Sequence, residues 1–238
     1  MTPVTLSNVG TELLDDPAAD PAIVVESLRN LARANWWFGG TAAALFGLGQ
    51  LLRDAARGTT WSLLDIGTGT ADLPRAAVRW AAAHGWRLVP IGLERSPVAA
   101  RLAVTTIPTV IGCAGTPPIR EKSVDVVLVS QVVHHLSPTS AIELFRACDR
   151  LARRGVVVAD LRRNVPAQVG FWFASHLLRF DRATREDGIT SIQRGYTRRE
   201  LAGLLSAAGV PATITGRPLS RLVATWHTDG PRDPHTVG

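Results

Sequence analysis

The residues with the clearest chemical meaning form an acid–glycine motif. Asp65 stands two residues before Gly67, and Gly69 lies two residues after it. Glycine lets the chain reverse sharply and lets a ligand approach the backbone without a Cβ in the way. A carboxylate before the first glycine would repel a pyrophosphate, but it can pair with a ligand that carries an ammonium group. The third glycine of a dinucleotide fingerprint is missing, because Asp72 occupies its position.

A second acid follows at the end of the next apolar run. Glu94 lies 29 residues after Asp65. A carboxylate at the end of a second strand can accept hydrogen bonds from both hydroxyls of a ribose. The two acids, with the glycine turn between them, therefore predict a site for a nucleoside that carries an amino group.

Three basic residues follow two further apolar runs. His134 and His135 come after the run at residues 124–129, and Arg162 comes after the run at residues 155–159. His134 and His135 can supply a general base for a hydroxyl group, since the pKa of histidine suits proton transfer near neutral pH. Alternatively, one of the two packs or caps while the other faces solvent. Arg162 can pair with a phenolate or carboxylate, or it can form a salt bridge at a helix end. We predict that all three contribute to catalysis.

Apolar periodicity predicts the elements that must position these residues. Short apolar runs predict strands over residues 61–66, 87–93, 108–111, 124–129 and 155–159. Helical spacing predicts intervening helices over 72–84, 97–105 and 139–152. Strands that alternate with helices imply right-handed βαβ units and a mainly parallel sheet. Outside this core we expect helices over 21–35, 41–56 and 198–208, and last strands over 212–216 and 220–227.

At the acid–glycine motif the chain resembles the class I S-adenosylmethionine (SAM)-dependent methyltransferases, and the similarity is clear over residues 60–160. The resemblance implies an α/β fold, with a doubly wound, mainly parallel, seven-stranded Rossmann-like sheet, and SAM as the cofactor. The family usually has Asp where this chain has Cys113. Since a thiol is a poor acceptor, we expect the backbone N–H of Ala114 to recognise adenine. The cofactor-binding residues we expect are Asp65, Gly67, Thr68, Gly69, Glu94, Arg95, Cys113, Ala114 and Ser130.

A narrower resemblance covers nearly the whole chain. Residues 30–40, 159–164 and 185–197 look like a group of bacterial methyltransferases found beside type III polyketide synthases. This resemblance implies a phenolic or polyketide-like small molecule as the acceptor, methylated on a hydroxyl group. The alternative is a catalytically silent protein of the same fold that acts through a partner, and a measurement of SAM affinity would help to distinguish the two.

We expect three parts along the chain: a helical N-terminal cap over residues 1–57, the SAM-binding domain over 58–228 and a flexible tail over 229–238. Residues 166–194 are predicted to form a lid insertion which, with residues 21–56, covers the acceptor site. These two segments contain two runs of aromatic residues that could wall the site: Trp36, Trp37, Phe38, Phe171, Trp172 and Phe173.

Composition and motifs argue against several other classes. The net charge is +6, but the basic residues are scattered, which does not suggest a nucleic-acid partner. The 17-residue uncharged stretch 36–52 is short for a membrane span, and the N-terminus lacks a signal peptide, so we expect a cytoplasmic protein without stable membrane insertion. Tyr196 and Lys122 are the one tyrosine and the one lysine, so a Tyr-x-x-x-Lys reductase pair is impossible. We expect no metal.

Overall fold

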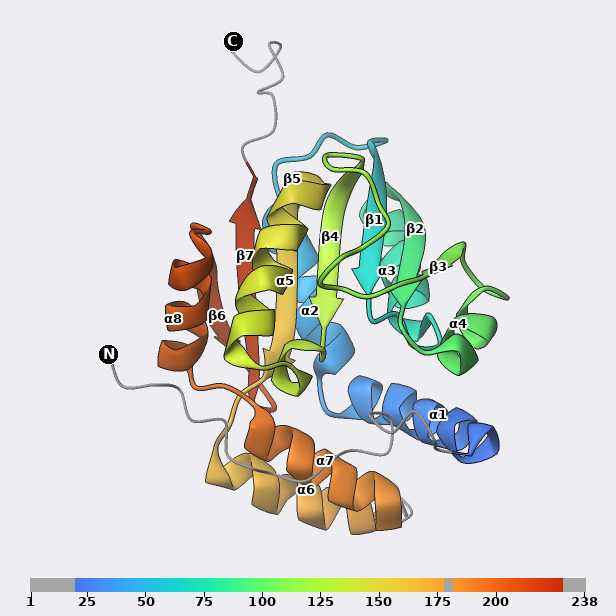
Figure 1. The fold of residues 1–238 in the computed structure, drawn as a ribbon, viewed down its shortest axis with the longest axis vertical. Coiled ribbons are helices and arrows are strands. Elements are labelled where there is room, and N and C mark those ends of the chain that lie inside the picture. Colours follow the sequence, from blue (N-terminus) through green and yellow to red (C-terminus); the bar gives the residue numbers. More distant parts are fainter. Residues whose placement is uncertain (1–19, 178–181, 229–238) are drawn as a thin grey trace.

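A seven-stranded sheet forms the centre of the computed structural model, which describes residues 20–177 and 182–228 (Figure 1). Its strand order is β3-β2-β1-β4-β5-β7-β6. The strands are β1 (Thr60–Ile66), β2 (Arg87–Glu94), β3 (Thr109–Ile111), β4 (Val124–Ser130), β5 (Ala152–Leu161), β6 (Thr213–Arg217) and β7 (Arg221–His227). β1 to β5 pair in parallel, whereas β7 is antiparallel to both β5 and β6. The predicted seven-stranded, mainly parallel sheet is confirmed.

Helices cover both faces of this sheet, as a doubly wound fold requires. The helices of the described residues are α1 (Pro21–Trp37), α2 (Gly40–Leu51), α3 (Asp72–Ala83), α4 (Pro97–Ala103), α5 (Pro138–Leu151), α6 (Val165–Leu177), α7 (Arg182–Arg194) and α8 (Arg198–Ala208), with a 3₁₀ turn η2 (Val133–His135). Leu48 of α2 and Ala77 of α3 pack together on one face of the sheet. Phe145 of α5 and Leu201 of α8 pack on the other. The central parallel strands β1, β4 and β5 are therefore largely buried on both sides, which explains their mainly apolar sequence.

The helix predicted over residues 41–56 does not belong to a cap beyond the sheet, where we expected it. Instead, α2 packs against β5 and β7 and belongs to the helical layer that covers one face of the sheet. Gly47 permits this close approach, because a Cβ there would lie 2.4 Å from Cγ1 of Val157. Of the N-terminal segment that the structure describes, only α1 lies beyond the end of the sheet (Figure 1). Residues 1–19 and the predicted tail 229–238 lie outside the described residues.

The carboxyl ends of the central strands meet at one edge of the sheet. The register pairs Ile66 with Val129 and Ser130 with Ala159. It also pairs Leu161 with Arg221, so the first residue of antiparallel β7 reaches the same edge. α1, α6 and α7 lie across this edge (Figure 1). The charged residues 182–194 form α7.

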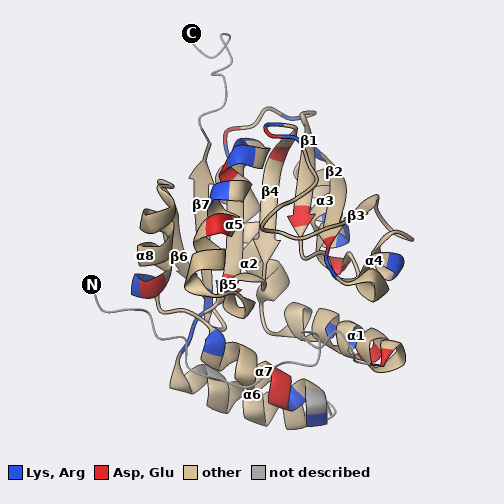
Figure 2. Ribbon diagram, viewed as in Figure 1, with Lys and Arg blue, Asp and Glu red and all other residues tan. Residues whose placement is uncertain are grey.

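Charged side chains do not gather on one side of the molecule in the view of Figure 2. Basic and acidic residues are interspersed on α5, α7 and α8, and α6 carries none of either sign. No helix within residues 20–177 and 182–228 has the length and apolarity needed to cross a bilayer.

Candidate active site

The acid–glycine motif forms a tight turn between β1 and α3. Gly67 and Gly69 have φ values of 75° and 56°, which favour glycine. A Cβ on Gly67 would lie 2.5 Å from Cγ2 of Val132, so the turn also requires glycine for space. The Gly67 N–H donates to the Leu93 carbonyl (2.8 Å), which joins the turn to β2. The motif thus forms the tight strand-to-helix turn that its glycines predict.

Asp65 is buried beneath this turn and lines a small cavity between the turn and α1. Its residue is 2% exposed. Burial raises the pKa of Asp65 to about 7, and the nearby Thr68 hydroxyl works against this rise. A buried carboxylate without a cation among its described neighbours is suited to receive one from a ligand.

Thr68 supplies a second sign that a ligand belongs in this cavity. Its Oγ1 is buried and, although it lies near enough to Asp65 to lower the pKa of that acid, it makes no hydrogen bond of good geometry with the described residues. Buried polar atoms are normally satisfied, so an unpartnered one at a cavity wall suits a polar ligand. The amino acid part of SAM, with its ammonium and carboxylate groups, fits Asp65 and Thr68 together. Gly67, Gly69 and Ser130 line the same cavity.

Glu94 lies at the end of β2 and supports the turn directly. Its Oε2 accepts a hydrogen bond from the Gly69 N–H (2.9 Å), and its Oε1 accepts one from the Ser96 N–H (2.9 Å). Each carboxylate oxygen keeps a further lone pair, so a ribose can still bind. Glu94 therefore holds the turn in shape as well as offering acceptors to a nucleoside.

Replacing Glu94 by Gln is expected to weaken binding of SAM and of its demethylated product, S-adenosylhomocysteine (SAH), by several-fold. The amide loses the charge, and its NH₂ group must face one of the two backbone N–H donors. Calorimetric titration with SAH would measure the change. The loss should stay below that of Asp65→Ala; a larger loss would reverse the roles assigned to the two acids.

The remaining predicted cofactor residues lie further from this cavity. Arg95 and Cys113 are exposed, Ala114 is half-buried, and none of the three lines the cavity at the turn. Their assignment to adenine and ribose stays a prediction.

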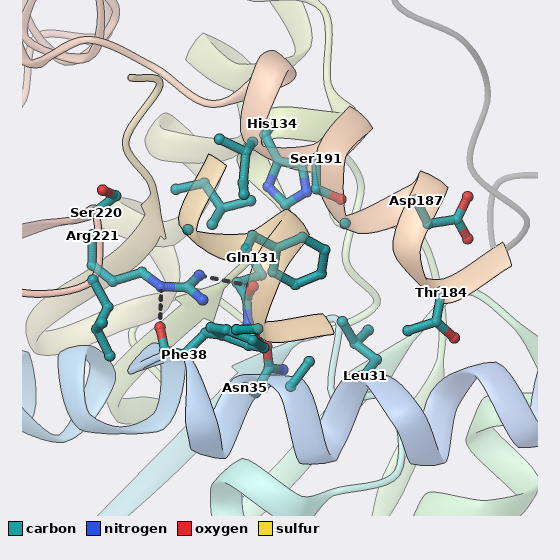
Figure 3. Close-up of a pocket in the computed structure, with 18 of the residues that line it drawn as sticks. Leu31, Asn35, Phe38, Gln131, His134, Thr184, Asp187, Ser191, Ser220 and Arg221 are labelled. Carbon is teal, nitrogen blue, oxygen red and sulfur yellow. Dashed lines mark hydrogen bonds between the residues drawn. The ribbon is translucent and has the colours of Figure 1, made fainter. Parts of the chain in front are cut away.

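A larger cavity of about 400 Å³ lies between α1, η2, α6, α7 and the start of β7 (Figure 3). His134 and His135 both line it. Of the aromatic residues expected to wall it, Phe38 and Phe171 do so, with ring centroids 4.9 Å apart. The others are exposed and lie outside the lining: Trp36, Trp37, Trp172 and Phe173. Clustering in the sequence was therefore a poor guide here, because neighbouring residues of a helix point in different directions.

His134 forms a buried pair with Asp160, whose role the sequence analysis missed. His134 Nδ1 lies 2.6 Å from Asp160 Oδ1, and the two side chains are 2% and 1% exposed. The Asp160 carboxylate also accepts hydrogen bonds from the N–H groups of Val133, His134 and Leu161. Burial acts to raise the pKa of Asp160, but His134 and these N–H groups outweigh it and hold the pKa below its usual value.

The anionic carboxylate of Asp160 determines which ring nitrogen of His134 carries the proton. An ionised carboxylate can only accept, so Nδ1 must donate to it, and Nε2 of a neutral ring is then an acceptor. The Tyr196 hydroxyl donates to the Val133 carbonyl (3.0 Å) and so supports the 3₁₀ turn that carries His134. The ring of His135 packs against that of His134, with centroids 4.2 Å apart.

The predicted Arg162 does not reach the large cavity. Its side chain is exposed, its backbone N–H donates to the Ser220 carbonyl, and it is absent from the cavity lining. A different arginine, Arg221 at the start of β7, lines the cavity instead. The prediction assumed that a residue just beyond β5 faces the site, but alternate residues of an extended chain point to opposite sides.

The two cavities share a wall formed by Leu31, Asn35 and Gln131. Gln131 has a positive φ of 55°, which is uncommon for a residue with a side chain. Its amide nitrogen donates to Asn35 Oδ1, and its Oε1 accepts from Arg221 Nη1 (2.9 Å). This network ties α1 to the ends of β4 and β7, and it places the acid–glycine turn next to the cavity that holds His134.

Comparison with known proteins agrees with this geometry. Residues 64–159 match a family model described as a methyltransferase domain. No curated protein sequence matches the chain. No group of three or more His, Cys, Asp or Glu residues within 20–177 and 182–228 is placed to hold a metal ion.

Solved methyltransferase structures share the fold at low sequence identity. A SAM-dependent methyltransferase from Aquifex aeolicus is 13% identical with a TM-score of 0.57, over 87% of this chain and 98% of its own. A putative O-methyltransferase from Nostoc punctiforme is 15% identical with a TM-score of 0.58, over 92% and 70%. The magnesium protoporphyrin IX methyltransferase from Synechocystis with bound SAH is 12% identical with a TM-score of 0.52, over 79% and 84%. The matched segment runs from β1 to β5 and contains the acid–glycine turn, Glu94 and His134; over these residues the chain is therefore similar to a methyltransferase domain.

Proposed function

We propose that the enzyme methylates a hydroxyl group of a small, largely apolar acceptor bound in the 400 Å³ cavity. The observation that carries this proposal is the buried His134–Asp160 pair, because its His134 lines the cavity that adjoins the SAM site. The shared wall at Asn35 and Gln131 brings the two cavities together, as direct transfer from donor to acceptor requires.

His134 would act as the general base in this reaction. Its Nε2 takes the proton of the acceptor hydroxyl while the oxygen forms its bond to the methyl carbon. Asp160 holds Nδ1–H and stabilises the resulting imidazolium, as a carboxylate does in other buried Asp–His pairs. SAM supplies a methyl group on a positively charged sulfur, which becomes the neutral thioether of SAH as the carbon–sulfur bond breaks.

The walls of the cavity favour a flat, apolar acceptor of phenolic or polyketide-like type. Phe38, Phe171, Leu161 and Ile192 contribute apolar surface to it. α1, α6 and α7 cover the acceptor in this proposal, with α6 and α7 forming the lid insertion. Among the structural neighbours, a putative O-methyltransferase and the human N-acetylserotonin methyltransferase support a small-molecule acceptor.

The proposal is tested by methyl transfer from isotopically labelled SAM to a panel of phenols and hydroxy aromatic acids. We expect SAH to accumulate in step with an O-methylated product identified by mass spectrometry. Methylation on carbon or nitrogen would overturn the hydroxyl assignment. Binding of SAM without turnover of any panel member would instead favour the silent protein that acts through a partner.

A further inference from the structure

Arg221 is a buried cation in a mainly apolar cavity. Its residue is 4% exposed, and it comes from the first position of β7. The Nε–H donates to the Phe38 carbonyl (2.9 Å), and Nη1 donates to Gln131 Oε1 (2.9 Å) (Figure 3). Both acceptors are neutral, so hydrogen bonding orients the guanidinium without neutralising its charge.

Part of the guanidinium remains available to a ligand. A guanidinium has five N–H donors, and these two hydrogen bonds are the ones it makes with the described residues. Both N–H groups of Nη2 and the second one of Nη1 are left without a protein acceptor there. Burial lowers the pKa of Arg221 to about 10, while Asp160 acts to raise it, so the group stays charged at neutral pH.

The acidic groups around the cavity do not pair with Arg221. Asp160 influences it electrostatically, but its oxygens are taken by His134 and by backbone N–H groups. Asp187 also lines the cavity, at the end away from Arg221 (Figure 3). No ion pair joins Arg221 to an acid within residues 20–177 and 182–228. A buried charge that the protein leaves unpaired is expensive, and an anionic ligand would remove that cost.

We propose that Arg221 binds a carboxylate of the acceptor, so that the enzyme acts on aromatic hydroxy acids. This inference rests on the proposed function, which assigns the cavity to the acceptor. Two of the spare N–H groups can engage the two oxygens of a carboxylate, a pairing for which the planar guanidinium is well shaped. Arg221 is the one arginine among the described residues that line the cavity, and no lysine lines it, which matches a ligand with one negative charge at this end. The hydroxyl to be methylated then lies elsewhere on the ring, toward His134 and the wall shared with the SAM site.

The test compares matched acids and amides in the SAH-loaded protein. The probes are 3- and 4-hydroxybenzoate and 4-hydroxycinnamate, each paired with its primary amide, and binding is measured by calorimetry. In the wild type we expect each acid that binds to bind about 10–100-fold more tightly than its amide, as a charge-assisted hydrogen bond allows. Arg221→Gln should abolish this preference. Arg162→Gln, which removes the exposed arginine outside the cavity, should preserve it.

Two controls distinguish an Arg221 variant that has lost the carboxylate site from one that has not folded. They are the Arg221→Lys variant and the melting curves of each protein. Lysine keeps the charge without the fork, so it should retain part of the preference for acids and bind SAH as the wild type does. Equal binding of acids and amides to the wild type would overturn the proposal, and so would the failure of all three acids to bind at millimolar concentration. Arg221-dependent binding of acids that are never methylated would confirm the subsite while contradicting the proposed reaction.

Discussion

Replacing His134 by Gln is expected to lower the turnover number by about 10²–10⁴-fold, the usual contribution of a general base. Glutamine cannot take the hydroxyl proton, whereas Nε2 of the wild-type ring can accept it, because Asp160 holds Nδ1–H and His134 lines the cavity. SAM affinity should stay within a few-fold, since His134 does not line the cavity at the glycine turn. Steady-state rates with an accepted phenol and calorimetry with SAH would measure the two quantities.

Two matched variants sharpen this result. Asp160→Asn should also reduce turnover strongly, because an amide can donate to Nδ1 and so favours the wrong tautomer. His135→Gln changes a neighbouring ring that packs on His134 but does not pair with Asp160 in the way His134 does, so its effect should be smaller. If His134→Gln kept the full rate at neutral pH, catalysis would rest on positioning alone.

Replacing Asp65 by Asn is expected to weaken SAM and SAH binding by at least tenfold. The amide cannot offer a negative charge to the ligand's ammonium group, and a charge-assisted hydrogen bond is worth about 1.5–3 kcal/mol. Asp65→Ala should have a similar effect. Unchanged calorimetric affinity in a folded Asp65 variant would overturn the assignment of the amino acid end of SAM to this cavity.

The same substitution should stabilise the ligand-free protein at neutral pH. The folded pKa of Asp65, about 7, lies above its ordinary value of 3.8, so folding favours the protonated acid. This raised pKa makes stability fall as the pH rises from about 4 to 7, and the penalty is complete above the folded pKa. Asp65→Asn removes a penalty on the order of 4 kcal/mol. The melting temperature of Asp65→Asn should exceed that of the wild type at pH 8, and the difference should be smaller at pH 4. This result would confirm that ionisation of Asp65 destabilises the folded protein.

The affinity for SAH should also depend on the ionisation of Asp65, and therefore on pH. At pH 6 about one-tenth of a group with a pKa of 7 is ionised, against about one-half at pH 7. Since the ammonium group needs the carboxylate form, SAH affinity of the wild type should increase roughly fivefold over this interval. Asp65→Asn should show no such increase. An identical slope in both proteins would assign the titration to another group.

The order of apolar runs was enough to predict the sheet and the cofactor turn, because both depend on short-range patterns. Strands buried on both faces must be continuously apolar, and helices follow β1, β2 and β4, as parallel βαβ units require. The turn needs glycine at residues 67 and 69 for its positive φ values, and the acid before it lies on the same strand. These features depend on short stretches of the sequence, so they can be predicted without knowing the contacts between distant segments.

The tertiary structure alone decided which side chains meet in the acceptor cavity. Arg221 follows the end of β5 by 60 residues in the sequence and reaches the site because β7 is antiparallel, which brings its first residue to the edge where β5 ends. Arg162 was the nearer candidate by sequence, but its side chain points to solvent. The pairing of His134 with Asp160 likewise needs the register of β4 and β5 and the turn of η2. Contacts between distant segments depend on strand direction, register and side-chain orientation, and none of these can be read from local composition.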